Sequence, residues 1–110
     1  MNETMKQIYE LHAEVCKTLA NSKRIEIINL LRSGEKPVAF LLKETALLKA
    51  NLSQHLSVMR QRGIVKARKK GLTVYYRIAN LKIVRACDLM REVLFEQMKE
   101  KGEILWPKRS

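Results

Sequence analysis

Residues 49–78 read KANLSQHLSVMRQRGIVKARKKGLTVYYRI, and the spacing of the apolar residues changes once along this stretch. In the first part, Leu52, Leu56 and Met59 recur at helical intervals, which predicts a helix over residues 49–61. Most other positions of this helix are polar. We therefore expect one buried face and one face that is free to meet solvent or a ligand.

The second part of the stretch has the composition of β-strands. Residues 64–68 and 72–78 are rich in β-branched and aromatic residues, and they flank Lys69-Lys70-Gly71. This arrangement predicts a β-hairpin, and Gly71 allows a tight tip because glycine adopts a positive φ without strain. Gly63 separates the hairpin from the helix as a C-terminal cap.

The flanking sequence adds further helices to this helix and hairpin. Apolar residues at helical spacing predict helices over residues 3–20, 21–32, 38–44 and 81–101. Asn21 is the expected N-cap of the second helix, and residues 33–37 are expected to form a turn. The predicted fold class is mainly α with a small β-hairpin (α+β). A length of 110 residues suits one domain, assigned to residues 1–101, with residues 102–110 as a basic C-terminal tail.

Positive charge is concentrated in one part of the chain. The net charge is +11, and residues 45–79 contain no acidic residue. The other 75 residues hold 14 basic and 11 acidic side chains. The eight basic residues of the acid-free segment are Lys49, Arg60, Arg62, Lys66, Arg68, Lys69, Lys70 and Arg77. Such a field indicates a polyanion as partner. A solvated basic face is one alternative; a membrane-surface helix is another, weakened because part of the charge lies in the hairpin.

Two short helices joined by a tight turn and followed by a basic hairpin form a winged helix-turn-helix. In this arrangement the second helix fits the major groove with polar side chains against base edges, and the hairpin reaches phosphates or the minor groove. The expected partner is double-stranded operator DNA. The side chains expected to contact it are Lys49, Asn51, Ser53, Gln54, His55, Arg60, Arg68, Lys69, Lys70, Thr73 and Tyr76.

The last helix has more apolar surface than one buried face requires. Its apolar residues form two rows, one through Ile83, Cys87, Met90 and Leu94 and a second through Ala86, Leu89 and Val93. One row can pack on its own domain while the other meets a partner. We therefore expect a homodimer with the first and last helices at its interface. The alternative is that both rows cover the core of one protomer.

Four motifs of the chain resemble ArsR/SmtB-type transcriptional repressors. They are KTLANSKRI at residues 17–25, NLSQHLSVMR at 51–60, GIV at 63–65 and VYYRI at 74–78. The similarity extends over roughly residues 10 to 98. The resemblance implies a dimeric winged helix-turn-helix repressor that leaves its operator when a metal or a thiol-reactive signal binds.

Two residues in the turn before residue 49 depart from the family pattern. Ala46 stands where these repressors often have glycine, and Leu48 where they often have a serine or threonine cap. A missing cap costs a helix about 0.5–2 kcal/mol. His55 has two interpretations: a DNA contact in the recognition helix, or a partly buried histidine that packs and hydrogen-bonds. Tyr75 is interpreted as a strand-packing residue.

The metal sites implied by the resemblance are missing. The thiolate site of the family uses Cys-Val-Cys where this chain has Pro-Val-Ala at residues 37–39. The zinc site of the last helix begins with Asp-x-His, whereas residues 80–82 are Asn-Leu-Lys and no histidine follows His55. Carboxylates without imidazole are weak zinc ligands, so we interpret Asp88, Glu92 and Glu96 as a solvated acidic face. His12 is interpreted as structural. We expect no metal and no cofactor.

Two cysteines, Cys16 and Cys87, are the remaining sensor candidates. Buried free cysteines are common in protein cores, so inert packing is one interpretation. The other is a thiol-based signal: in the family, the first and last helices meet at the dimer interface, where two thiols can approach and change the spacing of the recognition helices. The sulfur-sensing branch carries one of its cysteines in the second helix, where this chain has Asn29.

Other classes of function fit less well. The chain has no glycine-rich phosphate loop and no recognisable catalytic arrangement, so an enzyme is not expected. RNA modules usually stack bases on exposed aromatic side chains, and the basic segment offers only two adjacent tyrosines. No apolar stretch is long enough to cross a membrane and the first ten residues are polar, so we expect a cytoplasmic protein. The alternative function is a winged-helix DNA-binding protein without a small-molecule sensor, acting constitutively or through a protein partner. The inducer is not predicted.

Overall fold

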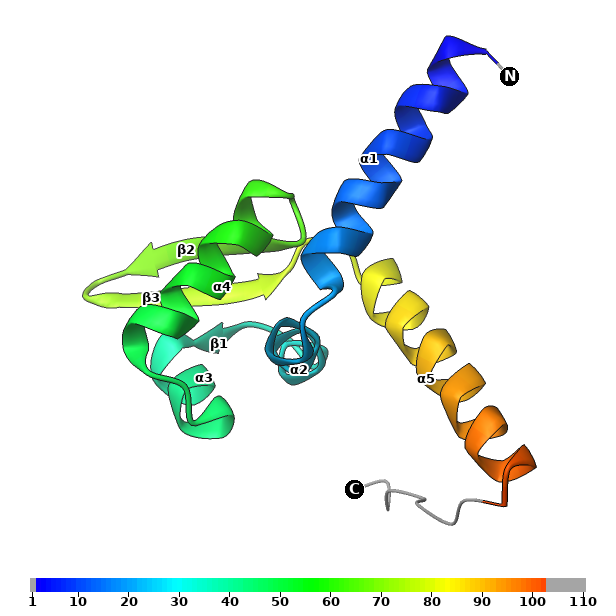
Figure 1. Ribbon diagram of the computed structural model, residues 1–110. Helices are drawn as coiled ribbons and strands as arrows, with labels where there is room; N and C mark the ends of the chain where they lie inside the picture. Colours follow the sequence, from blue (N-terminus) through cyan, green and yellow to red (C-terminus); the bar gives the residue numbers. More distant parts are fainter. Residues whose placement is uncertain (1, 103–110) are drawn as a thin grey trace.

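The computed structural model describes residues 2–102, and within them the chain folds into five helices and three short strands (Figure 1). Their bounds are α1 Glu3–Leu19, α2 Ser22–Leu30, β1 Lys36–Pro37, α3 Val38–Thr45, α4 Lys49–Gln61, β2 Val65–Lys70, β3 Thr73–Ile78 and α5 Lys82–Glu100. The predicted class, mainly α with a small antiparallel sheet, is confirmed. Apart from Gly102, the expected basic tail lies outside the described residues.

The start of α2 follows the predicted capping chemistry. The Asn21 side-chain oxygen accepts hydrogen bonds from the backbone N–H groups of Lys23 and Arg24, at 3.0 and 3.1 Å. A side chain that accepts from the first free N–H groups of a helix fixes where the helix begins. α2 ends at Leu30, two residues before the predicted end at Arg32.

The sheet has one strand more than the sequence indicated. Its order is β1-β3-β2, and all pairs are antiparallel. Lys36 and Pro37, expected in a turn, pair with Tyr76 and Tyr75 of β3. A two-residue strand is too short to show alternation, and proline is tolerated at the edge of a sheet, where one side of the strand needs no hydrogen bond. The prediction of a plain turn over residues 33–37 was therefore wrong at its C-terminal end.

The hairpin tip lies further along the chain than predicted. β2 continues through Lys70, which pairs with Thr73, so the loop consists of Gly71 and Leu72 alone. Gly71 has a φ of +63° and Leu72 does not have a positive φ. Glycine at the first position of a two-residue loop is typical of a type II′ turn, whose twist matches that of the strands.

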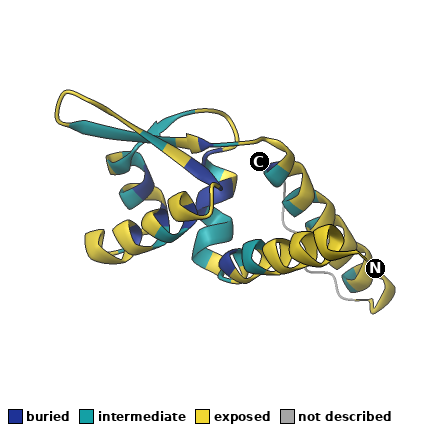
Figure 2. Cartoon of the chain, turned by 90° about the horizontal axis from the view of Figure 1, so that it is seen from above, coloured by how far each residue is buried: buried dark blue, intermediate teal, exposed yellow. Residues whose placement is uncertain are grey.

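The core lies between α2, α3, α4 and the inner face of the sheet. Its buried side chains are Ile27, Ile28, Leu31, Leu41, Leu52, Leu56, Met59, Ile64, Val65, Ile78 and Val84. α1 and α5 project away from this core in different directions (Figure 1), and most of their residues are exposed, as the yellow ribbon of Figure 2 shows. The helix-turn-helix and its wing are thus one packed body to which two long helices are attached.

Candidate DNA-binding interface

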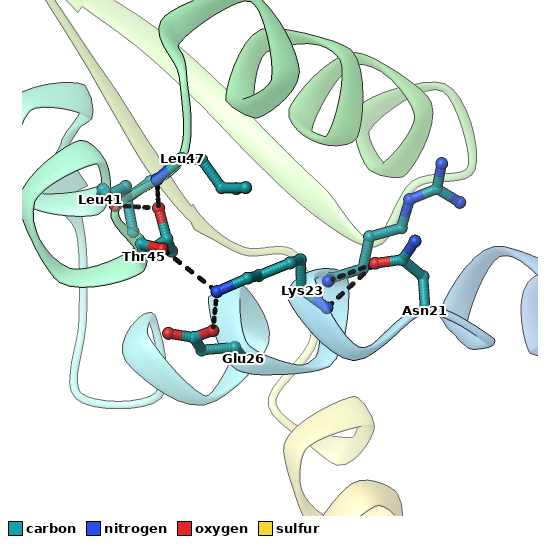
Figure 3. A network of polar contacts seen from close by, with 7 residues as sticks. Asn21, Lys23, Glu26, Leu41, Thr45 and Leu47 are labelled. Atoms are coloured by element: carbon teal, nitrogen blue, oxygen red, sulfur yellow. Dashed lines mark hydrogen bonds and ion pairs between the residues drawn. The ribbon is translucent and has the colours of Figure 1, made fainter.

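A polar network holds the turn between α3 and α4 against α2 (Figure 3). Lys23 Nζ donates to the backbone oxygen of Thr45 at 3.2 Å and pairs with Glu26 at 3.2 Å. The Thr45 hydroxyl donates to the Leu41 carbonyl at 2.7 Å and accepts from the Leu47 N–H at 3.3 Å. These bonds satisfy backbone groups at the end of α3. They therefore set the point in space from which α4 begins.

The two departures from the family pattern have structural counterparts in this turn. Ala46 adopts the left-handed conformation, with φ 56° and ψ 23°, and is the one non-glycine residue in the described part of the chain with a positive φ. Leu48 is the N-cap of α4 and makes no side-chain capping bond. The turn therefore keeps its shape although Ala46 has a strained backbone conformation and α4 has no side-chain cap.

The exposed side of α4 carries five of the eleven side chains predicted to contact DNA. Leu52, Leu56 and Met59 are buried as expected. The predicted contacts Lys49, Asn51, Ser53, Gln54 and Arg60 are exposed. Ser57, which was not among the predicted contacts, is exposed too, and the four-residue spacing places it on the same face as Ser53.

His55 is held by its own protomer. Arg24 Nε donates to His55 Nδ1 at 3.1 Å, and Arg24 Nη1 donates to the Thr18 carbonyl at 3.1 Å. Burial lowers the pKa of His55, and the nearby Arg24 guanidinium lowers it further. An imidazole that accepts at Nδ1 is neutral and carries its proton on Nε2. This is the environment expected of a packing histidine; a role for His55 at DNA remains a prediction.

A groove of about 370 Å³ separates α4 from the wing. It brings together four predicted contact residues, Lys49 and Ser53 from α4 and Thr73 and Tyr76 from β3. The rest of its lining is Val38, Ala39, Leu52, Leu56, Leu72 and Val74. The two elements expected to meet DNA therefore border one concave surface, with a basic residue at the start of the helix.

The wing tip combines charge with one apolar side chain. Lys69 and Lys70 are exposed, as predicted. Leu72 is 99% exposed, the highest value among the large exposed hydrophobic residues of the described chain, and was not among the predicted contacts. Its position in the two-residue loop, once the register is known, accounts for this exposure.

Arg68 is already engaged within the chain. Its Nε and Nη2 donate to the Glu35 carboxylate at 2.8–3.0 Å, and its guanidinium lies 5.2 Å from the centre of the Tyr75 ring. The hydrogen bonds from the Arg68 guanidinium lower the pKa of the Glu35 carboxyl group. Glu35 was missed because it lies in the segment interpreted as a turn, 33 residues from Arg68. Arg68 remains a proposed contact, but one that has an internal competitor.

The sensor candidates lie on the two projecting helices. Cys16 is an exposed free cysteine on α1, and Cys87 is a half-buried free cysteine on α5. Burial raises the pKa of the Cys87 thiol, which reduces its reactive thiolate form. The neighbouring Asp88 is bound by Arg32, at 2.8 and 3.0 Å, and by Arg91 at 2.6 Å.

No group of three or more His, Cys, Asp and Glu side chains within residues 2–102 is arranged to hold a metal ion. None of the helices in this range is long and apolar enough to span a bilayer.

Comparison with known proteins identifies the family. The family model described as bacterial regulatory protein, arsR family, matches residues 21–67. An uncharacterized HTH-type transcriptional regulator of Mycobacterium tuberculosis, Rv0081, is 37% identical over 99 residues, covering 89% of this chain and 87% of the relative. The biofilm growth-associated repressor of Xylella fastidiosa is 28% identical over 88 residues, covering 80% and 77%.

Solved structures agree with this assignment. The crystal structure of Rv0081 superposes with a TM-score of 0.79 at 38% identity, over 86% of this chain and 96% of that one. The homodimeric winged helix-turn-helix DNA-binding domain of Mb0332 from Mycobacterium bovis gives a TM-score of 0.81 at 30% identity, over 91% and 93%. The chain therefore belongs to the ArsR family of bacterial winged helix-turn-helix transcriptional regulators.

Proposed function

We propose that this ArsR-family regulator represses transcription as a homodimer that binds duplex operator DNA in the cytoplasm. The observation that carries the proposal is the exposed polar face of α4 beside the basic wing, with one groove between them. Repression is supported by relatives such as the repressor of Xylella fastidiosa. In a dimer, two copies of α4 would enter half-sites about one helical turn, roughly 34–36 Å, apart.

The proposed contact residues divide into two roles. Asn51 and Gln54 have amide groups that suit adenine in the major groove, and Lys49 suits guanine or a phosphate. The remaining proposed contacts position the protein on the backbone or groove: Ser53, His55, Arg60, Arg68, Lys69, Lys70, Thr73 and Tyr76.

The homodimer is supported by apolar side chains that α1 and α5 leave exposed. On α1 these are Met5, Ile8, Tyr9 and Leu11, and on α5 they are Leu89, Met90, Val93 and Leu94, all between 37% and 64% exposed. Large apolar side chains left exposed in such number are typical of an interaction site. The neighbour Mb0332 is itself homodimeric.

Binding of variants to duplexes selected by the protein from a random pool tests the proposal. Gln54→Ala should relax base preference by roughly 1–3 kcal/mol at one position. Lys69→Ala should weaken binding to all sequences alike and flatten the salt dependence by about one unit per lost phosphate contact. If both variants behave alike on selected and scrambled duplexes, α4 is not the reader.

We propose that the signal that releases the protein from its operator acts on the thiols of Cys16 and Cys87. Cys16 is exposed and lies on the same helix as the proposed interface residues of α1, while Cys87 is the more protected thiol. We expect persulfide or oxidant treatment to modify these cysteines, as mapped by mass spectrometry, and to lower operator affinity in a gel-shift assay. Unchanged affinity after modification would favour the alternative, a regulator without a small-molecule sensor.

A further inference from the structure

The sheet of the wing has two faces of different character. Side chains alternate between the faces of a sheet, and directly paired residues share a face. Val65 and its partner Ile78 are buried on the core side. The next pair, Lys66 and Arg77, is exposed and therefore lies on the opposite face. We call this the outer sheet face; it consists of the pairs Lys66–Arg77 and Arg68–Tyr75 together with Lys70.

The outer sheet face carries unbalanced positive charge. Lys66 and Arg77 stand directly opposite each other in the register, and like charges in that position destabilise a sheet. In the described part of the chain neither has an ion-pair partner. Glu35 at the edge neutralises Arg68, and its lowered pKa also reflects the charges of Arg77 and Lys70. Glu35 is therefore one carboxylate near the three cations Arg68, Lys70 and Arg77, and it is already paired with Arg68.

We propose that the outer sheet face binds the phosphates of duplex DNA that flanks the operator, beyond the half-site read by α4. The proposal rests on the proposed DNA binding by α4 and the wing tip. The wing ends at the loop of Gly71 and Leu72, so the face toward α4 and the outer sheet face border the same tip. A duplex that passes the tip can continue along the outer face if it bends toward the protein, and added phosphate contacts offset the bending.

Comparing duplexes of two lengths distinguishes DNA binding by the outer sheet face from DNA binding by α4. A duplex of about 20 bp covers two half-sites, and adding about 10 bp at each end supplies the flanks. Both duplexes come from sequences that the full chain selects from a random pool. We expect the native protein to bind the longer duplex more tightly and with a steeper dependence on salt.

The double variant K66A/R77A should bind the long duplex no better than the short one. Its salt slope on the long duplex should fall by about 3 to 4 units, because a dimer would lose four phosphate contacts at about 0.9 each. The matched control K82A/R85A removes the same two charges from exposed positions on α5 and should keep the preference for the long duplex. Because the Lys66–Arg77 repulsion is gone, the melting temperature of K66A/R77A should not fall; if it does, K66Q/R77Q is used instead.

The outcomes distinguish this inference from the proposed function. An equal loss on both duplexes, or no loss on either, overturns the outer sheet face as a flank-binding surface. An unaltered preference of K66A/R77A for the long duplex overturns it too, and would leave the face to an acidic protein partner. If Gln54→Ala leaves selective binding of the short duplex unchanged, the failure is that of the proposed operator reading by α4.

Discussion

At the scale of single residues, Ala46 shows how a local strain is tolerated in this fold. A left-handed backbone brings Cβ close to the carbonyl oxygen and costs a non-glycine residue about 1–2 kcal/mol. The Thr45 network and the Ala46 N–H, which donates to the Leu42 carbonyl at 3.0 Å, hold the residue there. Because these bonds are made by the backbone and by Thr45, they do not require alanine at this position.

Ala46→Gly is therefore expected to stabilise the protein. Glycine removes the strain but loses more chain entropy on folding, so the net gain in the free energy of unfolding should be about 0.5–1 kcal/mol. Urea denaturation followed by circular dichroism measures it. The matched control, Ala50→Gly at an exposed helical position of α4, should lose about 0.5–1 kcal/mol. Destabilisation by both changes would contradict the strain at Ala46.

A second expectation at this scale concerns Glu35. Because Arg68 is the main cause of its lowered pKa, Arg68→Ala should raise the pKa of Glu35 toward its ordinary value. Carbon-detected NMR titration of the carboxyl group measures this pKa. Arg62→Ala is the control: Arg62 pairs with Glu14 on α1, at 2.9 Å, so this change should leave Glu35 as it is. An unmoved pKa in Arg68→Ala would contradict the ion pair in solution.

At the scale of elements, the sequence predicted the helices and strands whose apolar spacing repeats. It missed a very short strand and the contacts between residues far apart in the chain. The bounds of α4 were predicted to the residue because its apolar period and Gly63 agree. β1 has two residues and thus no period. The polar contacts of Lys23 and Arg24 join residues 22 and 31 positions apart, a relation that no local pattern carries. The predicted contact set could therefore be placed on α4 and the wing, while the competitor of Arg68 could not be foreseen.

The junction of α2 and α5 should be sensitive to acid. Arg32 and Arg91 hold the pKa of Asp88 at about 2, below its ordinary value of 3.8. A carboxylate with a lowered pKa in the folded state contributes stability above its unfolded pKa, and this contribution disappears as pH falls from about 4 through about 2. Since these side chains are partly exposed, the expected contribution at pH 7 is only about 0.2–1 kcal/mol.

Asp88→Asn should therefore be less stable than the native protein at pH 7, and this difference should shrink below pH 4. Denaturant midpoints of both proteins across this pH range test the expectation. Glu92→Gln removes one exposed carboxylate from the same helix without breaking the Arg32–Asp88 pair, and it serves as the control. A difference between Asp88→Asn and the native protein that stays constant down to pH 2 would rule out the pairing as its source.

At the scale of the whole molecule, ion pairs connect the two projecting helices to the core that contains α4. Glu14 joins α1 to Arg62 at the end of α4, and Asp88 joins α5 to Arg32 after α2. The apolar side chains that α1 and α5 expose find no cover in the described residues of the protomer. A dimer that buries them would fix the relative positions of the two copies of α4, so assembly and operator reading are expected to depend on each other.

Leu89→Glu tests this dependence, because Leu89 is 62% exposed and its replacement leaves the protomer core intact. A carboxylate at an apolar interface is costly to bury, so light scattering should show a mass near the 12.8 kDa of one chain. Affinity for a duplex with two half-sites should fall about a hundredfold or more, since the second half-site is no longer bound by a linked subunit. Leu72→Glu at the wing tip should have the opposite signature, with the dimer mass retained and weaker binding of single and paired half-sites alike. A dimeric Leu89→Glu protein would exclude this face of α5 from the interface.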